Sequence, residues 1–204
     1  MPARVVPDRI IVGVTGSSAP QLGLTVLQAL RDVPIEVHLV LSAGAALSIE
    51  AEMGVSTVEF EELADVVHRA EDLGAAISSG SFRTRGMVVV PCSMRSLAAI
   101  ATGNTTDLVS RAADVCLKER RRLVLVTRET PLNLIHIRNM ETVTLAGATV
   151  LPPVPAFYHR PRSVEDLLRH IAGKVLDQFD LEHDLFRRWE GVPEQGAVVA
   201  DAAR

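Results

Sequence analysis

Short runs of small aliphatic residues recur along this chain of 204 residues, and each run leads through a loop of small or hydroxyl-bearing residues into a helical pattern. The first run covers 9–14 and precedes a helical pattern over 21–30. The second covers 35–41 and precedes a helical pattern over 42–52. Apolar runs without polar alternation are typical of strands buried on both faces of a parallel sheet. The sequence therefore predicts a doubly wound α/β fold.

The same alternation continues through the rest of the chain with less regular spacing. Further strands are predicted over 86–90, 123–127 and 149–151. Further helices are predicted over 60–69, 97–103, 107–118, 134–146 and 163–179, and loops over 74–81 and 152–161. Because the pattern shows no repeat and no second domain, we expect one domain over 1–183 and a C-terminal tail over 184–204.

Aromatic residues make up only 3% of the chain, and the single Tyr and single Trp are Tyr158 and Trp189. Ala, Val and Leu must therefore build most of the core. Such a core suits Ala-rich helices packed on a parallel sheet, and it suits a β-sandwich poorly, because sandwiches use many aromatic and β-branched residues.

Charge and cysteine content exclude several functional classes. The net charge of −4 argues against nucleic-acid binding as the main task. Cys92 and Cys116 lie in apolar surroundings and cannot form a disulfide framework, so we expect a reducing, cytoplasmic location. No apolar run approaches the roughly 18 residues of a membrane span, and the first residues lack a signal-peptide core.

Polar loops follow four of the predicted strands, at 15–18, 42, 91–96 and 127–130. The carboxyl ends of parallel strands meet at one edge of a sheet, where ligands bind. Gly, hydroxyl groups and helix N-termini at that edge favour a phosphate-bearing cofactor, although Ser and Thr are also common helix caps. Ser18 and Ala19 interrupt a dinucleotide-binding glycine pattern, and no Gly-Lys-Ser/Thr follows, so NAD and ATP are disfavoured.

Metal and thiol chemistry are not expected. His136 and His159 lack the spacing of metal ligands. Cys92 has no His nearby in the sequence and is better interpreted as a small buried residue than as a nucleophile.

Two long motifs lie in the second half of the chain: Arg-Glu-Thr-Pro, at the end of 115–131, and Pro-Ala-Phe-Tyr-His-Arg-Pro, at the end of 151–161. With 91–93, 97–103 and 163–168, they resemble the flavin prenyltransferase family (UbiX), over about 9–181. The resemblance implies a flavodoxin-like or Rossmann-like subunit, usually assembled into a homo-oligomeric dodecamer with active sites between subunits. It also implies a metal-free transfer of a dimethylallyl group from dimethylallyl phosphate to N5 and C6 of reduced FMN. The product, prenylated FMN, serves a partner UbiD-type decarboxylase.

Position by position, the resemblance implies three overlapping groups of site residues. Those expected to contact FMN are Gly16, Ser17, Ser18, Ser42, Ser93, Met94, Arg95, Ser96 and Arg128. Those expected to bind the substrate phosphate are Lys118, Arg128, Tyr158 and Lys174. Those expected to act in catalysis are Ser18, Glu52, Lys118 and Glu129, with Glu129 handling protons at the flavin and Glu52 reaching the site from a neighbouring subunit.

Elementary chemistry is consistent with these roles, because fixed cations and a phenol donor stabilise a departing phosphate and a carboxylate can accept the proton lost on alkylation. Each residue also has an ordinary alternative. Lys118 lies next to 120–122 and would suit a solvated helix end. Arg128 and Glu129 would suit a surface ion pair.

Two departures from the family pattern keep other functions open. Ala19 and Pro20 follow Ser18 where the family usually has Gly, and Leu73 stands where it usually has Trp. The first alternative is an FMN-binding oxidative decarboxylase of the cysteine-decarboxylase type, loosely suggested by Asn104 in Ala-Thr-Gly-Asn-Thr-Thr. The second is a non-catalytic flavin-binding subunit of a decarboxylase system, for which Leu73 is the main support.

Overall fold

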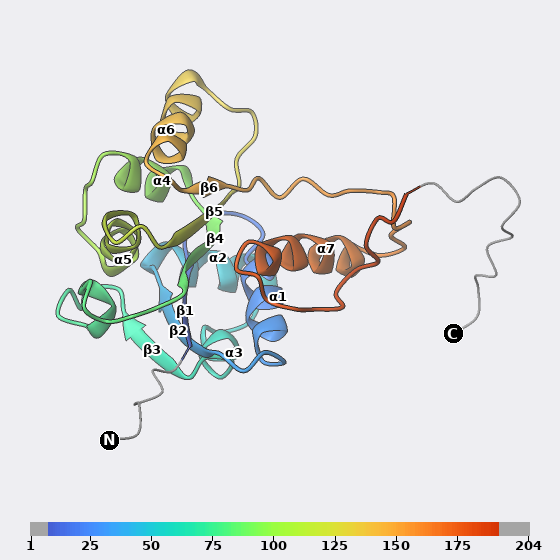
Figure 1. Ribbon diagram of the computed structural model, residues 1–204, viewed down its shortest axis with the longest axis horizontal. Helices are drawn as coiled ribbons and strands as arrows, with labels where there is room; N and C mark the ends of the chain where they lie inside the picture. The colour runs from blue at the N-terminus through green and yellow to red at the C-terminus, as the bar shows by residue number, and fades with distance from the viewer. Residues whose placement is uncertain (1–7, 192–204) are drawn as a thin grey trace, which may run out of the picture.

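Six parallel strands form one sheet in the computed structural model, which describes residues 8–191 (Figure 1). The strands are β1 (Arg9–Val14), β2 (Glu36–Leu41), β3 (Val66–Arg69), β4 (Gly86–Cys92), β5 (Arg122–Thr127) and β6 (Thr149–Val150). Their order is β3-β2-β1-β4-β5-β6, with parallel pairing throughout. The order runs outward in both directions from β1 and β4, which confirms the doubly wound fold and is the Rossmann order rather than the flavodoxin order.

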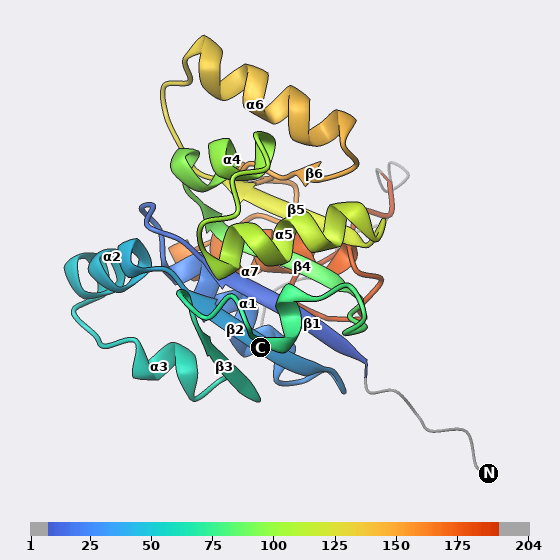
Figure 2. The ribbon, with the colours of Figure 1, turned by 90° about the vertical axis from the view of Figure 1, so that its left-hand side faces the viewer.

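Helices cover both faces of this sheet (Figure 2). They are α1 (Gln21–Leu30), α2 (Ala43–Met53), α3 (Val58–Glu61), α4 (Met94–Ala101), α5 (Leu108–Lys118), α6 (Leu134–Leu145) and α7 (Val164–Asp177), with a short 3₁₀ helix at Ala76–Ser78. Helices α1 and α7 pack together on one face, and α4 and α5 lie on the other, where α6 packs outside α4.

The strands are buried on both faces, as their continuous apolar runs predict. Ile10 and Val12 point into the core under α1 and α7, whereas Ile11 points into the core under α5. Successive side chains of a strand alternate between faces, so a strand between two helical layers needs an apolar residue at every position. Few rings are needed to fill this core, and Phe60 and Phe179 are its largest fully buried side chains.

The helix predicted over 60–69 is wrong beyond its first two residues. Helix α3 ends at Glu61, and the chain then forms the edge strand β3, in which Val67 pairs with Leu39 of β2. A strand of four residues gives too few alternations between buried and exposed positions to be recognised in the sequence. Its hydrogen bonds to β2 decide its conformation, and these depend on the tertiary structure.

The segment that follows α7 packs against that helix over the residues that the structure describes. Leu185 packs on the core, and the ring centroid of Phe186 lies 4.7 Å from that of His170. A Cβ atom at Gly173 would lie 2.5 Å from Phe186, so only glycine allows this close approach. The predicted tail begins within this packed segment, and its part over 192–204 lies outside the described residues. Within 8–191, no helix is long and apolar enough to span a membrane.

Candidate functional site

The loops at the carboxyl ends of β1, β2, β4 and β5 are joined to one another by the backbone. The N–H of Thr15 donates to Pro91 O at 3.2 Å, and the N–H of Ser42 donates to Val14 O at 3.0 Å. The N–H of Arg128 donates to Cys92 O at 3.2 Å. Because these strands are neighbours in the sheet, the four predicted loops form one continuous edge.

Two hydroxyl groups reinforce this edge. Thr15 Oγ1 donates to Pro91 O at 2.9 Å and accepts from the Ser93 N–H at 2.8 Å. Ser17 Oγ donates to Arg128 O at 3.0 Å. Thr15 was not among the predicted site residues, although it stands directly after the first strand. Its role depends on β4 lying beside β1, and that neighbourhood cannot be read from one strand alone.

Helices α2 and α4 point their N-termini at the same edge. Ser42 caps α2 by accepting from the Ala45 N–H at 3.1 Å, and Ser93 caps α4 by accepting from the Ser96 N–H at 3.2 Å. The ordinary capping role is therefore real for both serines. It leaves the other first-turn N–H groups, including that of Arg95, without intrahelical partners, and such groups bind phosphate.

The first loop lies directly on the start of α2. A Cβ atom at Gly16 would lie 2.8 Å from the backbone of Gly44, so any side chain at position 16 would separate the two segments. Ala19 has φ of 68°, a left-handed conformation that costs free energy for a residue other than glycine. The N–H of Ala19 donates to Glu52 Oε2 at 2.9 Å, and Ser18 Oγ donates to the same oxygen at 3.1 Å.

The expected reach of Glu52 into a neighbouring subunit's site stays a prediction, and within its own chain Glu52 contacts the first loop. The reason is topological. Helix α2 follows β2, which is the neighbour of β1, so the side of α2 that bears Glu52 lies against the loop after β1. Ser18 and Glu52, predicted separately, therefore form one hydrogen-bonded unit.

The end of β5 holds a buried polar atom without a partner. Thr127 Oγ1 is buried and makes no hydrogen bond within the part of the chain that the structure describes. It immediately precedes Arg128, which is partly buried, and Glu129, which is exposed and accepts from the Thr130 N–H at 3.1 Å. An unpaired buried hydroxyl costs free energy unless a ligand supplies its partner. With the Gly16–Gly44 contact and the open helix N-termini, it makes this edge fit a flat, phosphate-bearing group such as FMN.

Lys118 lies at the opposite edge of the sheet, so within one chain it does not join the other predicted site residues at the strand-end loops. It is the last residue of α5, four residues before β5 starts at Arg122, and it forms an ion pair with the adjacent Glu119. A helix that connects two parallel strands must return the chain to the amino-terminal edge, and this places Lys118 there. Within one chain, Lys118 behaves as a half-exposed helix end.

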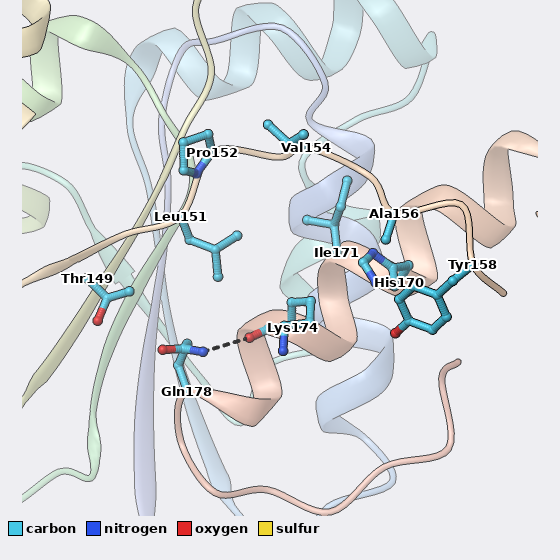
Figure 3. Close-up of a pocket in the computed structure, with 10 residues that line it drawn as sticks. All are labelled: Thr149, Leu151, Pro152, Val154, Ala156, Tyr158, His170, Ile171, Lys174 and Gln178. Carbon is cyan, nitrogen blue, oxygen red and sulfur yellow. Dashed lines mark hydrogen bonds between the residues drawn. The ribbon is translucent and has the colours of Figure 1, made fainter. Parts of the chain in front are cut away.

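Tyr158 and Lys174 line a separate pocket of about 430 Å³, between α7 and the loop that follows β6 (Figure 3). Thr149, His170 and Gln178 also line it. The C-terminal end of α7 lies toward the amino-terminal edge of the sheet, since Arg85, just before β4, donates to Phe179 O at 2.8 Å. Among residues 8–191, no hydrogen bond or ion pair connects Tyr158 or Lys174 with the strand-end loops.

Rings gather around this pocket despite their scarcity in the chain. The ring of Tyr158 lies 5.7 Å from that of Trp189 and 6.1 Å from that of His170, measured between centroids. His159 stacks on His170 at 4.8 Å. Burial lowers the pKa of His170, and the electrostatic interactions with His159 and Lys174 lower it further. The ring cluster therefore favours a neutral His170 and packs against the ring of Tyr158.

Two other predicted positions have simple outcomes. Cys92 is fully buried, and burial raises the pKa of its thiol to about 12, which removes it as a nucleophile at neutral pH. Leu73 is half-exposed in the loop between β3 and β4 and places no ring there. Among the described residues, no three His, Cys, Asp or Glu side chains form a group able to hold a metal ion.

Comparison with known proteins gives consistent matches over nearly the whole chain. Residues 3–176 match the model of the flavoprotein family. A probable UbiX-like flavin prenyltransferase from Streptomyces sp. (strain D7) is 54% identical over 185 residues, which cover 90% of this chain and 92% of the relative.

Solved structures agree with these sequence matches. AnUbiX, in complex with FMN and dimethylallyl pyrophosphate, shares 53% identity with a TM-score of 0.90, over 92% of this chain and 100% of that one. The dodecameric FMN-dependent UbiX-like decarboxylase from Escherichia coli O157:H7 shares 51% identity with a TM-score of 0.87, over 90% of this chain and 100% of that one.

Proposed function

We propose that this chain, which belongs to the flavoprotein family and within it to the UbiX-like flavin prenyltransferases, transfers a dimethylallyl group from dimethylallyl phosphate to reduced FMN. One observation carries the proposal: the loops after β1, β2, β4 and β5 are hydrogen-bonded into a single edge, toward which the N-termini of α2 and α4 point. The loops form this edge in a fold that superimposes on that of a relative in complex with FMN and dimethylallyl pyrophosphate.

The chain's own groups at this edge would hold the flavin. When bound, reduced FMN supplies the nucleophilic N5 and C6 atoms that receive the allyl group. Gly16 has no Cβ atom that would separate the first loop from the start of α2, and the first-turn N–H groups of α4, at Met94 and Arg95, suit the phosphate of the flavin. Ser17 fixes the position of the loop that bears Arg128.

Cations and a phenol would then stabilise the departing phosphate. Arg128 lies at the flavin edge, whereas Lys118 lies at the opposite edge and Tyr158 and Lys174 lie in the pocket beside α7. Fixed charges aimed at the leaving group lower the barrier to breaking its C–O bond. Because one chain keeps these groups apart, we propose that copies of the chain complete each other's sites in a homo-oligomer, as a dodecameric relative suggests.

The carboxylates have separate tasks in this proposal. Glu129 is exposed at the flavin edge and would accept the proton that the flavin loses when it is alkylated. Glu52 holds Ser18 and the Ala19 N–H, so it fixes the first loop against the flavin. We further propose a metal-free reaction, a cytoplasmic location, and a UbiD-type decarboxylase as the acceptor of prenylated FMN. The catalytic domain would be residues 1–183.

The decisive experiment is an anaerobic incubation of the purified assembly with reduced FMN and dimethylallyl phosphate. We expect the extracted flavin to gain the mass of one prenyl unit, with the altered absorption spectrum of an alkylated flavin. A parallel incubation with dimethylallyl diphosphate identifies the preferred donor. Flavin that binds to the protein but emerges unaltered with both donors would overturn the proposed function and favour the non-catalytic alternative.

A further inference from the structure

Asp177, in the last turn of α7, accepts hydrogen bonds from three side chains. Its Oδ2 accepts from Lys174 Nζ at 3.0 Å. Its Oδ1 accepts from Arg188 Nη2 at 2.8 Å and lies 3.2 Å from His183 Nε2. The Asp177 side chain is 16% exposed. Burial alone would raise its pKa, but the hydrogen bonds from Arg188 and Lys174 lower the pKa to about 2. The carboxylate is therefore ionised at all ordinary pH values.

His183 takes part in this cluster as a neutral donor. Its Nδ1 accepts the Leu185 N–H at 3.2 Å, which leaves the proton on Nε2, facing Asp177. One carboxylate thus faces two full positive charges, those of Lys174 and Arg188, and one neutral N–H donor. The group carries an excess of one positive charge beside the pocket that Lys174 lines.

Lys174 has to serve two acceptors if the pocket binds phosphate. Its ammonium group is paired with Asp177 in the present structure, and it also belongs to the wall of the pocket that contains Tyr158. If the departure of a lysine left a partly buried carboxylate unpaired, phosphate binding by that lysine would lose free energy. Here Asp177 would keep both Arg188 and His183, so the departure of Lys174 leaves no unpaired charge.

The segment after α7 is fixed in a position that keeps Arg188 beside Asp177. Phe186 and His183 pack against Gly173, where a Cβ atom would lie within 2.7 Å of either ring. The Arg188 guanidinium lies 5.6 Å from the ring centroid of Phe186, and the next residue, Trp189, packs its ring against Tyr158. Arg188 is therefore anchored on both sides, beside the pocket and within reach of Asp177.

We propose that Arg188 is a positioning residue of the substrate-phosphate site: by sharing Asp177, it releases the Lys174 ammonium to the phosphate of the allyl donor. The identity of that ligand rests on the proposed function. Arg188 itself does not line the pocket, so its effect passes through Asp177 and Lys174.

A double-mutant cycle on the full-length assembly tests this sharing. Dimethylallyl phosphate and inorganic phosphate are titrated calorimetrically into the flavin-free protein, for the wild type, Arg188→Gln, Asp177→Asn and the double variant. We expect Arg188→Gln to raise the Kd of both ligands about three- to tenfold, because Lys174 then has to leave a poorly paired carboxylate. In the Asp177→Asn background the same replacement should change Kd by less than about twofold, because no carboxylate competes.

Two further variants separate sharing from simple structural damage. Arg188→Lys keeps the positive charge and should keep Kd near the wild-type value. Arg187→Gln changes the neighbouring exposed arginine, which forms no ion pair within residues 8–191, and should leave Kd unchanged. In turnover assays, Arg188→Gln should raise KM for the allyl donor while kcat stays near the wild-type value.

An equal loss of affinity from Arg188→Gln in both backgrounds, or no loss in either, would overturn the proposal. If Arg188→Gln fails to assemble, the Arg188→Lys and Asp177→Asn titrations decide instead. A higher Kd in Arg188→Lys, or a higher Kd in Asp177→Asn, then contradicts the sharing of Asp177. Because these titrations need no turnover, a protein that binds phosphate as expected yet transfers no prenyl group would refute the proposed function alone.

Discussion

Two hydrogen bonds to one oxygen of Glu52 hold the first loop in its strained conformation. Ser18 Oγ and the Ala19 N–H both donate to Glu52 Oε2, and Ala19 has a positive φ. A conformation of that kind persists only where its surroundings fix it. At the scale of single residues, the first role of Glu52 is therefore to shape the loop, and any role in proton transfer depends on that shape.

Replacement of Glu52 by Ala should weaken flavin binding by about tenfold and lower the free energy of unfolding by about 1 kcal/mol, because both loop donors lose their acceptor. Glu52→Gln keeps an oxygen acceptor and should retain most of the affinity. Fluorescence titration with FMN and denaturant unfolding measure the two effects. The exposed neighbour Glu50 is the matched control: Glu50→Ala should change neither quantity, and an equal effect there would assign the loss to the helix rather than the loop.

A second residue-scale prediction concerns two histidines. Burial lowers the pKa of His68, and so does the electrostatic interaction with His38, whose Nδ1 lies 2.9 Å from His68 Nε2. Burial also lowers the pKa of His170. As pH falls through about 6.5, the unfolded chain gains these protons while the folded chain resists them, so folding loses free energy.

Denaturant unfolding should therefore show lower stability at pH 5.5 than at pH 7.5. His68→Gln should reduce this difference, because one of the two contributing groups is removed. Asp177 stays ionised throughout this interval and adds nothing to the slope. A pH dependence of the same size in His68→Gln and His170→Gln as in the wild type would contradict the assignment.

At the scale of elements, the loop after β1 lies in close contact with the start of α2. Gly16→Ala would place a Cβ atom 2.8 Å from the backbone of Gly44, and backbone atoms cannot move aside as a flexible side chain can. We expect the loop to shift, with a cost of about 1–3 kcal/mol in stability and a marked loss of FMN affinity.

Calorimetric unfolding and FMN titration check this expectation for Gly16→Ala. Gly74→Ala is the matched control, because its Cβ atom would approach only the Asp72 side chain, at 3.3 Å. If Gly16→Ala bound FMN with the wild-type affinity, the close approach of the two segments would not shape the flavin site.

The starts of helices could be located from the sequence where both residues of the cap lie within a few positions of one another. Asp107 and Ser163 each form a capping box with the residue three positions on, and the helices begin there as the pattern indicates. Helix α4 instead begins at Met94, earlier than predicted, because Ser93 caps it from within a loop that β1 positions. Strand β3 was missed for a similar reason, since its pairing partner lies elsewhere in the sequence.

At the scale of the whole molecule, one chain is an incomplete enzyme under the proposed function. Arg128 and Glu129 lie at the carboxyl edge of the sheet and Lys118 at the amino edge. Helix α6 also exposes Leu134, Ile135 and Leu145 to 60% or more, an apolar surface typical of an interface between subunits. Assembly of several copies would bury that surface and bring the two edges together.

Mixing two inactive variants tests this division of the site. Lys118→Ala and Glu129→Gln should each lose most prenyl transfer, since each removes one side of the site. If the two residues of a site come from different copies, co-assembled variants should regain about a quarter of the wild-type activity, because random mixing leaves that share of sites intact. No recovery in verified mixed oligomers would place both residues in the same copy's site.

The local sequence pattern was sufficient for most of the elements and for the chemical types of residue at the site, but not for the edge strand β3. Buried parallel strands need apolar residues at every position, and the turns after them need small or hydroxyl residues. Both patterns can therefore be recognised in consecutive residues. The resemblance to a family then supplied the roles of Arg128, Glu129 and the other matched positions, which no periodicity could assign.

Tertiary structure alone decided which of those residues meet. Helix α5 ends with Lys118 at one edge of the sheet and β5 leads to Arg128 at the other, although only nine residues separate them in the sequence. The same packing brings Ser18 to Glu52 and Arg188 to Asp177, because contacts between distant segments depend on strand order and helix packing. Neither strand order nor helix packing can be predicted from residues that are neighbours in the chain.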